Sequence, residues 1–399
     1  MGERGTIAMD AMLTRLQAQN FKSFRTLDIP LGPLNVLVGP NMGGKSNLLD
    51  LLRFLYESWF PQPGTYGPEN AITRRGGMDE VLWKGGPDKL LSIGVEVTDP
   101  TRPDRRFQYG IELVAGATGY VNIQTERLAL FERQTQQHLI TRDAQGRWLT
   151  NAGGQRLITV EAQRSAMELA LQNWDGRLLR LFVQNWRYYN LVPSLMKQPN
   201  PVVEGGALKS QGQNLSAWLM WLQTRAPETF NRVAEVAQDA FPEIRRLLTW
   251  PTLEGTVNLM SEEKALARRV PLVQMSDGEL AFIALLSLIY APGGLSGTLL
   301  LIEEPENHLH PRLLETVVAL LRQVQEEATG RGVLPYQIIL TTHSPYLVNQ
   351  MNLDEILWIE KKKGETIVVR PHDKAHLRKL VEDKELGIGD LMLTGALGQ

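Results

Sequence analysis

Residues 34–46 read LNVLVGPNMGGKS. The first five residues form a largely apolar run, which predicts a strand buried on both faces. The last eight residues match the pattern G-x-x-x-x-G-K-S in full. Leucines at helical spacing follow, so a helix is predicted over about residues 45–58. The stretch therefore predicts a strand, a glycine-rich loop and a helix in direct succession.

The chemistry of this loop suits a phosphate chain. Glycines allow consecutive backbone N–H groups to face inward around phosphate oxygens, and the start of the helix adds a partial positive charge. The Lys45 side chain would reach the β and γ phosphates, and the Ser46 hydroxyl would ligate magnesium. With a buried strand before it and an amphipathic helix after it, the loop predicts nucleotide binding rather than a chance glycine turn.

A second candidate cluster follows another buried strand. Residues 299–306 read LLLIEEPE, which places acids at the carboxyl end of an apolar run. Open α/β sheets bind ligands at that end of their strands. Glu303 could hold magnesium from the side opposite Ser46, and Glu304 could orient the attacking water. The alternative is an acidic cluster that complements the dipole of the helix predicted to begin at Pro311.

Two shorter motifs lie near these clusters. Residues 275–279, MSDGE, precede an apolar helix, and Ser276 with Gly278 would make an anion-ready helix start; an ordinary N-cap is the alternative. Residues 341–345, TTHSP, follow another buried strand. There His343 could touch a γ-phosphate or the attacking water, or it could be an ordinary loop histidine.

The wider pattern predicts an α/β protein with an inserted lobe. Three parts are expected: 1–150, with the phosphate loop and an antiparallel β-subdomain; 151–262, a compact helical lobe; and 263–399, the rest of the core. Strand–helix alternation after residue 270 indicates a mainly parallel sheet with right-handed crossovers. Residues 60–78 are expected to form a long loop. Early strands are expected at 13–21, 24–29, 90–97, 107–114 and 121–131.

Composition excludes several classes of protein. The chain has 399 residues with 42 Lys and Arg against 44 Asp and Glu, so it does not coat nucleic acid by bulk charge. It contains no cysteine, which removes disulfides, thiol nucleophiles, cysteine-ligated zinc and iron–sulfur clusters. The longest apolar run, 280–291, is too short to span a membrane. We expect a cytoplasmic protein without a membrane partner.

The four motifs, in this order, resemble the ATP-binding-cassette (ABC) ATPases, and more closely the RecF, SMC and OLD branch that acts on DNA. Residues 20–24, NFKSF, resemble a turn that lies beside the nucleotide in that branch. Residues 302–311 and 341–345 are similar to the RecF-like and OLD-like AAA ATPases of bacteria, as are 212–215 and the chain's end. The likeness spans most of the chain, and its motifs are weakest in the lobe.

The resemblance implies that two protomers sandwich two ATP molecules head to tail. It implies catalytic roles for Lys45, for Glu304 as the catalytic carboxylate and for His343 as the switch histidine. Magnesium would be held by Ser46 and Glu303. The residues implied to bind ATP within one chain are Lys22, Ser23, Asn41, Met42, Gly43, Gly44, Lys45, Ser46 and Asn47. Those implied to bind it from the second chain are Ser276, Gly278 and Glu279.

The sequence also departs from that family's pattern. Glu303 stands where Asp is usual, which adds one methylene to the magnesium position. Glu279 stands where transporters often have Gln, and His310 stands where their D-loop has Asp. No Gln lies at a convincing Q-loop position, which leaves the γ-phosphate sensor between the lobes unassigned. The residues after Arg370 are too few for the nuclease domain of the OLD nucleases, so we expect none in this sequence.

The leading hypothesis is an ATP-hydrolysing dimer that acts in DNA repair or anti-phage defence, with a separate effector such as a nuclease. One alternative is a transporter's nucleotide-binding subunit, which the long gap from Lys45 to Ser276 argues against. Another is an ATP-switched scaffold or nucleotide-binding subunit for a protein partner without DNA contact, which the presence of Glu304 argues against. Residues 174–189 mix aromatic and basic side chains as single-strand binders do, although helical spacing favours a core role for the tryptophans.

Overall fold

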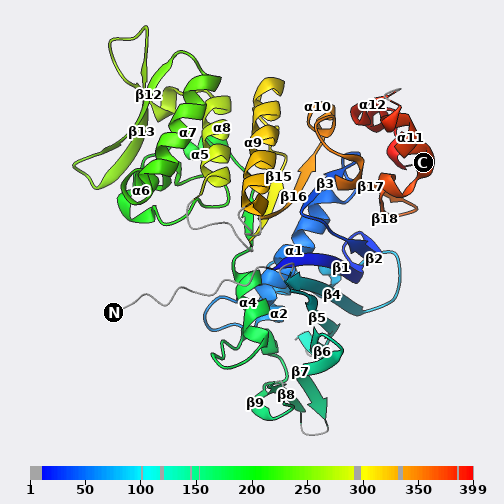
Figure 1. Ribbon diagram of the computed structural model, residues 1–399. Coiled ribbons are helices and arrows are strands. Elements are labelled where there is room, and N and C mark those ends of the chain that lie inside the picture. The colour runs from blue at the N-terminus through cyan, green and yellow to red at the C-terminus, as the bar shows by residue number, and fades with distance from the viewer. Residues whose placement is uncertain are drawn as a thin grey trace.

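The computed structural model describes residues 11–99, 102–116, 121–143, 146–151, 153–291, 298–330, 336–383 and 386–398. Its elements form three sheets. A six-stranded sheet lies at the centre, an eight-stranded antiparallel sheet lies below it, and a lobe with a small sheet extends to one side (Figure 1). The phosphate-loop motif directly follows a strand of the central sheet, so that sheet positions the candidate site.

The strands fall into these three sheets in a clear order. The central sheet has the order β10 (Arg187–Tyr189), β15 (Leu299–Glu303), β16 (Gln337–Thr342), β3 (Leu34–Val38), β17 (Ile356–Lys362), β18 (Glu365–Val369). The antiparallel sheet has the order β2 (Phe24–Pro30), β1 (Met12–Phe21), β4 (Leu90–Asp99), β5 (Arg102–Ala115), β6 (Val121–Glu132), β7 (Thr135–Asp143), β8 (Gly146–Thr150), β9 (Arg156–Val160). The lobe's sheet has the order β11 (Asn200–Pro201), β13 (Thr256–Glu263), β12 (Ile244–Pro251), with β14 (Val270–Pro271) paired to β13.

Helices cover both faces of the central sheet and fill the lobe. The α-helices are α1 (Lys45–Trp59), α2 (Gly67–Thr73), α3 (Met78–Val81), α4 (Gly176–Gln184), α5 (Pro193–Met196), α6 (Leu215–Arg225), α7 (Pro227–Ala240), α8 (Asp277–Ile289), α9 (Pro311–Gly330), α10 (Pro345–Val348), α11 (Ala375–Glu382) and α12 (Ile388–Leu393). Among the described helices, none is both long enough and apolar enough to cross a bilayer. The apolar helix α8 is instead buried inside the molecule.

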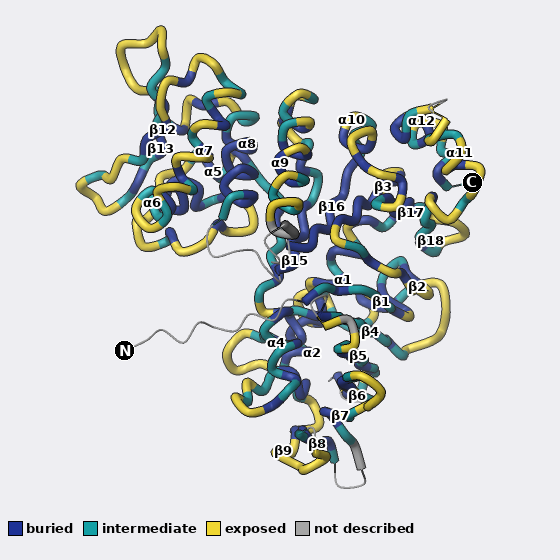
Figure 2. Tube along the Cα trace, viewed as in Figure 1, coloured by how far each residue is buried: buried dark blue, intermediate teal, exposed yellow. Residues whose placement is uncertain are grey.

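The central sheet is buried on both faces, as its apolar strands predict. Its strands run parallel except β18, which pairs antiparallel with β17. Side chains of β3 alternate between two cores: Leu37 joins the core of α1, whereas Val36 and Val38 join that of α8 and α9. The burial view shows β15, β16 and β3 as a dark, continuous centre (Figure 2). This alternation explains why the strands read as uninterrupted apolar runs.

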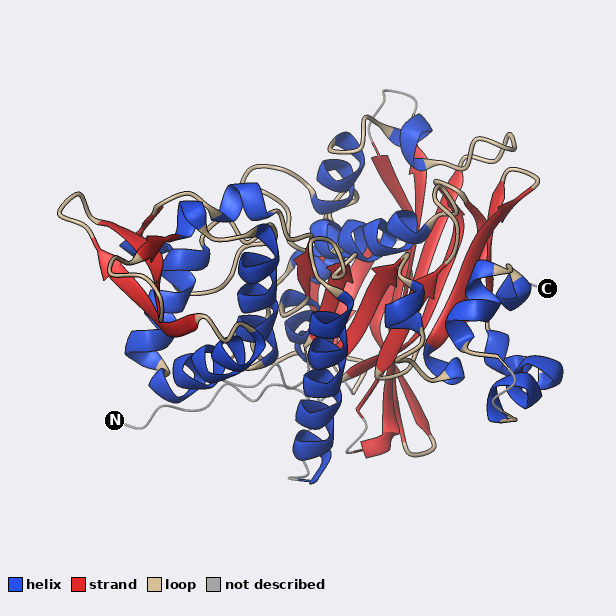
Figure 3. Ribbon diagram, turned by 90° about the horizontal axis from the view of Figure 1, so that it is seen from above, coloured by secondary structure: helices blue, strands red, loops and turns tan. Residues whose placement is uncertain are grey.

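Helix α1 lies between the central sheet and the antiparallel sheet. Its leucines share one core with strands β1, β4 and β5 and with Leu37 and Leu301 of the central sheet. The view from above shows helices packed along the strands of the molecule (Figure 3). The strands predicted at the start of the chain are confirmed as β1 and β2, and those over 90–131 as β4, β5 and β6. The mixed α/β architecture predicted from the sequence is present.

The predicted loop over 60–78 is partly wrong, because residues 67–73 form helix α2. The sequence carries a start signal there, with Pro68 in the first turn and Glu69 close to the positive end of the helix. A Cβ at Gly67 would lie 1.9 Å from the Ser58 carbonyl oxygen, so α2 packs directly on α1. The helix is therefore stabilised by tertiary packing that local composition does not reveal.

The lobe contains strands as well as the helices expected from its sequence. Strands β12 and β13 form a hairpin against α6, and the alternating burial along β13 points Val257, Leu259 and Ser261 inward. Strand β9 pairs with β8 of the antiparallel sheet, and β10 joins the central sheet beside β15. The boundaries proposed at residues 151 and 263 stay a prediction.

A buried ion pair ties the far end of the antiparallel sheet together. The Glu126 carboxylate is fully buried and accepts from the Arg147 guanidinium. It also accepts from the Tyr109 hydroxyl at 2.9 Å and from the Ser165 hydroxyl at 2.6 Å. The backbone N–H of Ala166 donates to the same carboxylate. This carboxylate thus joins β5, β6 and β8 to the segment that leads out of the sheet.

We expect Arg147→Met to lower the free energy of unfolding by about 3–5 kcal/mol, because it leaves the Glu126 charge buried without its cation. Lys84→Met is the control, since its pair with Glu80 is exposed on both sides, and it should cost less than about 1 kcal/mol. Urea unfolding followed by circular dichroism measures both. An equal effect of the two substitutions would contradict this assignment.

Candidate nucleotide-binding site

The loop 39–46 needs glycine for steric reasons at three positions, one of them Gly43, where a Cβ would lie 2.8 Å from the Ile359 carbonyl oxygen. A Cβ at Gly39 would lie 1.9 Å from the carbonyl oxygen of Ile359. Gly44 has φ +115 and precedes α1, and a Cβ there would lie 2.3 Å from Thr366 Oγ1. The loop is therefore pressed against β17 and β18, which hold its backbone in the curved form that surrounds an anion.

Thr366 of β18 joins this loop to the turn at residues 22–23. Its hydroxyl donates to the Gly43 carbonyl oxygen at 2.8 Å and lies 2.8 Å from Ser23 Oγ. Ser23 Oγ also accepts from Asn47 Nδ2 at 2.7 Å. Ser23 thus lies beside the loop, as the resemblance implies, whereas Lys22 forms an ion pair with Asp50 at 2.6 Å.

Lys45 is almost completely buried inside the loop. Its Nζ donates to the carbonyl oxygens of Gly39 and Pro40, both at 2.9 Å. Burial lowers the pKa of Lys45 to about 8, and the negative charges of Glu304 and Glu306 oppose this shift. The ammonium therefore lies in a site where an added phosphate would stabilise its charge.

Ser46 and Glu303 meet across the mouth of the loop. Ser46 Oγ donates to Glu303 Oε1 at 2.6 Å. Two adjacent oxygens, one from a hydroxyl and one from a carboxylate, suit Mg²⁺, which usually takes one or two protein ligands together with phosphate oxygens and water. In the described part of the chain, no three His, Asp or Glu side chains converge as a ready metal site. The donor set therefore fits a nucleotide-bound magnesium better than a permanent metal centre.

The other oxygen of Glu303 is held by residues that the sequence did not single out for the site. The Tyr188 hydroxyl and Asn190 Nδ2 both donate to Glu303 Oε2, the second at 3.2 Å. Burial and the bond to Glu303 raise the pKa of Tyr188, so its hydroxyl remains a donor. Asn190 follows β10, which pairs with β15. An amide that follows an edge strand thus reaches the Glu303 carboxylate, although no Gln marks this place in the sequence.

Glu304 lies beside His343 at the tip of the sheet. Its Oε1 is 3.3 Å from His343 Nε2, and its Oε2 accepts from Asn307 Nδ2 at 3.0 Å. Glu304 has φ +45, a left-handed conformation that costs energy for a residue with a side chain. Burial, and next the Lys45 charge, lower the pKa of His343, which favours the neutral ring.

Glu306 holds the loop that carries His343. Its Oε1 accepts from the Thr342 hydroxyl at 2.6 Å and from the backbone N–H of His343 at 2.7 Å. The sequence suggested only that Glu306 complements a helix dipole. Its role as a brace depends on β15 and β16 being neighbours, which the sequence does not state.

Ser276, Gly278 and Glu279 form the start of α8. Ser276 Oγ accepts from the Glu279 N–H at 3.2 Å, and Glu279 Oε2 accepts from the Ser276 N–H at 2.7 Å. Ser276 is thus an N-cap, the alternative given from the sequence, and the reciprocal bond from Glu279 makes it a capping box. A Cβ at Gly278 would lie 2.8 Å from the His308 carbonyl oxygen. The turn therefore packs on the loop after β15, and Ser276 itself is exposed.

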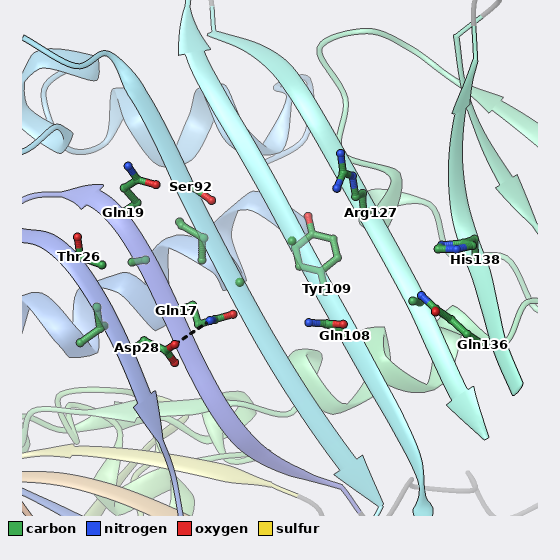
Figure 4. A pocket seen from close by; sticks show the side chains of 16 residues that line it. Gln17, Gln19, Thr26, Asp28, Ser92, Gln108, Tyr109, Arg127, Gln136 and His138 are labelled. Atoms are coloured by element: carbon green, nitrogen blue, oxygen red, sulfur yellow. Dashed lines mark hydrogen bonds between the residues drawn. The ribbon is translucent and has the colours of Figure 1, made fainter. Parts of the chain in front are cut away.

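A separate hollow of about 520 Å³ lies on the open face of the antiparallel sheet (Figure 4). Gly94 and Gly110 are paired across β4 and β5 in its floor, so no side chain fills the middle. Gln17, Gln108 and Arg127 lie around it (Figure 4). Its strands do not include β3, β15 or β16, so it is distinct from the cluster around Lys45 and Glu303.

Two comparisons of sequence show what parts of the chain are similar to. Residues 155–349 match the family described as AAA domain, putative AbiEii toxin, Type IV TA system. This range contains the Glu303 and His343 segments but begins after the phosphate loop. A segment of 38 residues, 10% of this chain, is 53% identical to the OLD nuclease of Thermus scotoductus. That segment spans only 7% of the nuclease's length.

Solved structures give the fold over nearly the whole chain. An SMC head bound to the C-winged helix domain of ScpA has a TM-score of 0.57 at 15% identity, over 90% of this chain and 97% of that one. An SMC head with an extended coiled coil, bound to the C-terminal domain of ScpA and derived from Pyrococcus furiosus, has a TM-score of 0.51 at 14% identity. It covers 94% of this chain and 100% of that one.

The pKa of Lys45 leads to a prediction on pH. Phosphate binding needs the ammonium, so above pH 8 the free protein must first take up a proton, and affinity for a nucleotide with magnesium should fall. Between pH 7 and pH 9 we expect about a tenfold loss of affinity by calorimetry with a non-hydrolysable triphosphate. Lys45→Arg is the control, because it stays charged over this range. An equal loss in both proteins would assign the pH effect to other groups.

Proposed function

We propose that this chain, an ABC-type P-loop ATPase of the RecF, SMC and OLD-like branch, hydrolyses ATP with magnesium across a head-to-tail homodimer and acts in DNA metabolism with a separate effector protein. The 2.6 Å contact between Ser46 Oγ and Glu303 Oε1 carries the catalytic part of this proposal. It joins the phosphate loop to the acidic strand tip, which lie far apart in the sequence.

The loop binds the triphosphate in this proposal. Backbone N–H groups of the loop and of the start of α1 donate to the phosphate oxygens. Lys45 exchanges its bonds to the two loop carbonyls for bonds to phosphate oxygens, which stabilises its ammonium. Ser46 and Glu303 hold magnesium, which neutralises charge on the phosphate oxygens. Tyr188 and Asn190 keep the Glu303 carboxylate in place.

Glu304 then positions the water that attacks the terminal phosphate. Its carboxylate lies one residue beyond Glu303, and its φ of +45 turns it away from the strand direction. His343, at 3.3 Å, orients the carboxylate and can contact the same water. Asn307 holds the other carboxylate oxygen, so the base is held in position before the reaction.

A second copy would complete the site. Ser276 is exposed. Its hydroxyl oxygen accepts one hydrogen bond at the helix start, and its O–H can still donate to an incoming phosphate. In the head-to-tail arrangement that the resemblance implies, this hydroxyl and the N–H group of Gly278 contact the γ-phosphate held by the other chain, and Glu279 holds the turn through the capping box. Groups supplied from a second chain raise phosphoryl-transfer rates by about 10³–10⁵ in other enzymes.

The match to the OLD nuclease supports a role in DNA repair or anti-phage defence. A protein partner without DNA contact is the second candidate, since the SMC heads similar in fold are bound to domains of ScpA. Capture of partners on the ATP-bound protein separates the two: co-purified nucleic acid favours the first, and a stoichiometric protein alone favours the second.

We expect Glu304→Gln to keep ATP binding but lower hydrolysis by at least about 10²-fold, because the amide cannot accept the proton of the attacking water. The variant should also accumulate as an ATP-bound dimer, which size-exclusion chromatography with light scattering measures. Glu315→Gln, on the exposed side of α9, is the control and should hydrolyse ATP like the native chain.

Two results would contradict the proposal. Hydrolysis by Glu304→Gln at the native rate would remove Glu304 from the reaction. A monomer at every concentration of ATP and magnesium would remove the two-chain site.

A further inference from the structure

We propose that a cavity of about 340 Å³ beside the magnesium carboxylate binds a nucleotide unit, free or within a single strand, and that Tyr188 couples its occupancy to Glu303. This "Tyr188 cavity" is lined by α1, by β10 and by Leu301 of β15; the residues that carry the inference are Arg53, Tyr56, Phe60, Arg74, Trp186 and Tyr188. Its volume is in the range of small-ligand pockets.

Aromatic rings supply the walls on which a base could stack. Tyr56 of α1 and Phe60, the residue that caps the end of α1, have ring centroids 5.0 Å apart, and both line the cavity. Trp186, which directly precedes β10, also lines the cavity. Among the described residues, the buried indole Nε1 of Trp186 has no hydrogen-bond partner. The rings of Tyr56, Phe60 and Trp186 therefore give the cavity an aromatic lining.

Arginines at the rim supply positive charge for a phosphate. Arg53 Nε and Arg74 Nη1 both lie 3.2 Å from the same oxygen, Glu57 Oε1. The other oxygen of Glu57 is held by Arg75 at 2.6 Å. Arg53 and Arg74 are each about half exposed. The guanidiniums of Arg53 and Arg74 therefore share one carboxylate oxygen, so part of their positive charge is not neutralised by Glu57 and can attract an anion.

Tyr188 connects this cavity to the nucleotide site. The Arg53 guanidinium lies over its ring at 5.4 Å from the centroid, while its hydroxyl donates to Glu303 Oε2. A ligand that draws Arg53 toward a phosphate, or that stacks beside the ring, changes the position of that hydroxyl. Glu303 would then shift relative to Ser46. This coupling rests on the proposed ATPase function, whereas binding in the cavity does not.

The first experiment measures binding without ATP. Fluorescence anisotropy of a labelled oligothymidylate should give saturable binding, and Arg53→Gln and Arg74→Gln should each weaken it about threefold or more. Arg232→Gln is the matched control: Arg232 pairs with Glu235 on its own helix and lies over the Tyr290 ring, outside the cavity. It should bind like the native chain.

A second arm separates the two sources of the ligand. Calorimetry with thymidine monophosphate, without magnesium, tests a free nucleotide on the same variants. Binding of the strand or of the mononucleotide that depends on Arg53 and Arg74 supports the proposal and names the source. Binding of neither probe, or binding unchanged by both substitutions, overturns it. The lack of ATP in these assays separates this outcome from a failure of the ATPase proposal.

Tyr188→Phe tests the coupling, since it removes only the hydroxyl that reaches Glu303. In the native chain, the probe that binds should shift the magnesium concentration for half-maximal ATP hydrolysis about threefold or more. Tyr188→Phe keeps the ring, so the probe should still bind saturably, but this shift should vanish. A shift of the native size in Tyr188→Phe would overturn the coupling through Tyr188.

Discussion

The hydrogen bond between Ser46 and Glu303 depends on the order of strands in the central sheet. Ser46 follows β3 and Glu303 ends β15, and these strands are not neighbours, because β16 lies between them. The carboxyl ends of parallel strands meet at one edge of a sheet. His343 follows the intervening strand and so lies between the two. Three loops from distant parts of the sequence therefore converge only when all three strands pair in this order.

Two hydrophobic cores enforce that order. Adjacent side chains of β3, β15 and β16 point alternately to α1 and to α8 and α9. If the pairing of any of these strands shifted by one residue, each of its side chains would point into the opposite core, where it does not fit. The antiparallel sheet packs against the other side of α1. Thr366 of β18 donates a hydrogen bond to the Gly43 carbonyl oxygen of the loop. The burial of Lys45, and with it the lowered pKa, follows from this packing.

The inserted segment contributes more to the site than its sequence suggested. Residues 187–189 return from the antiparallel sheet as the edge strand β10, and Tyr188 and Asn190 come from there to Glu303. The strand is too short for an alternating pattern to reveal it. Helix α2 and the β12–β13 hairpin were missed for a related reason. Their stability comes from packing on α1 and α6, which local composition does not encode.

The sequence by itself determined the parts whose chemistry is local. The glycine loop, Lys45, Ser46 and the paired acids at the end of β15 predict a phosphate and magnesium site, because their residue types and flanking patterns are contained within short windows. The long strands and helices were also predictable, because apolar periodicity follows directly from which face is buried. Only the tertiary structure decided that Thr366 braces the loop, that Tyr188 and Asn190 hold Glu303 and that Glu306 holds the His343 loop. Those contacts depend on strand order and on how far distant segments return, and neither is written in the spacing of residues along the chain.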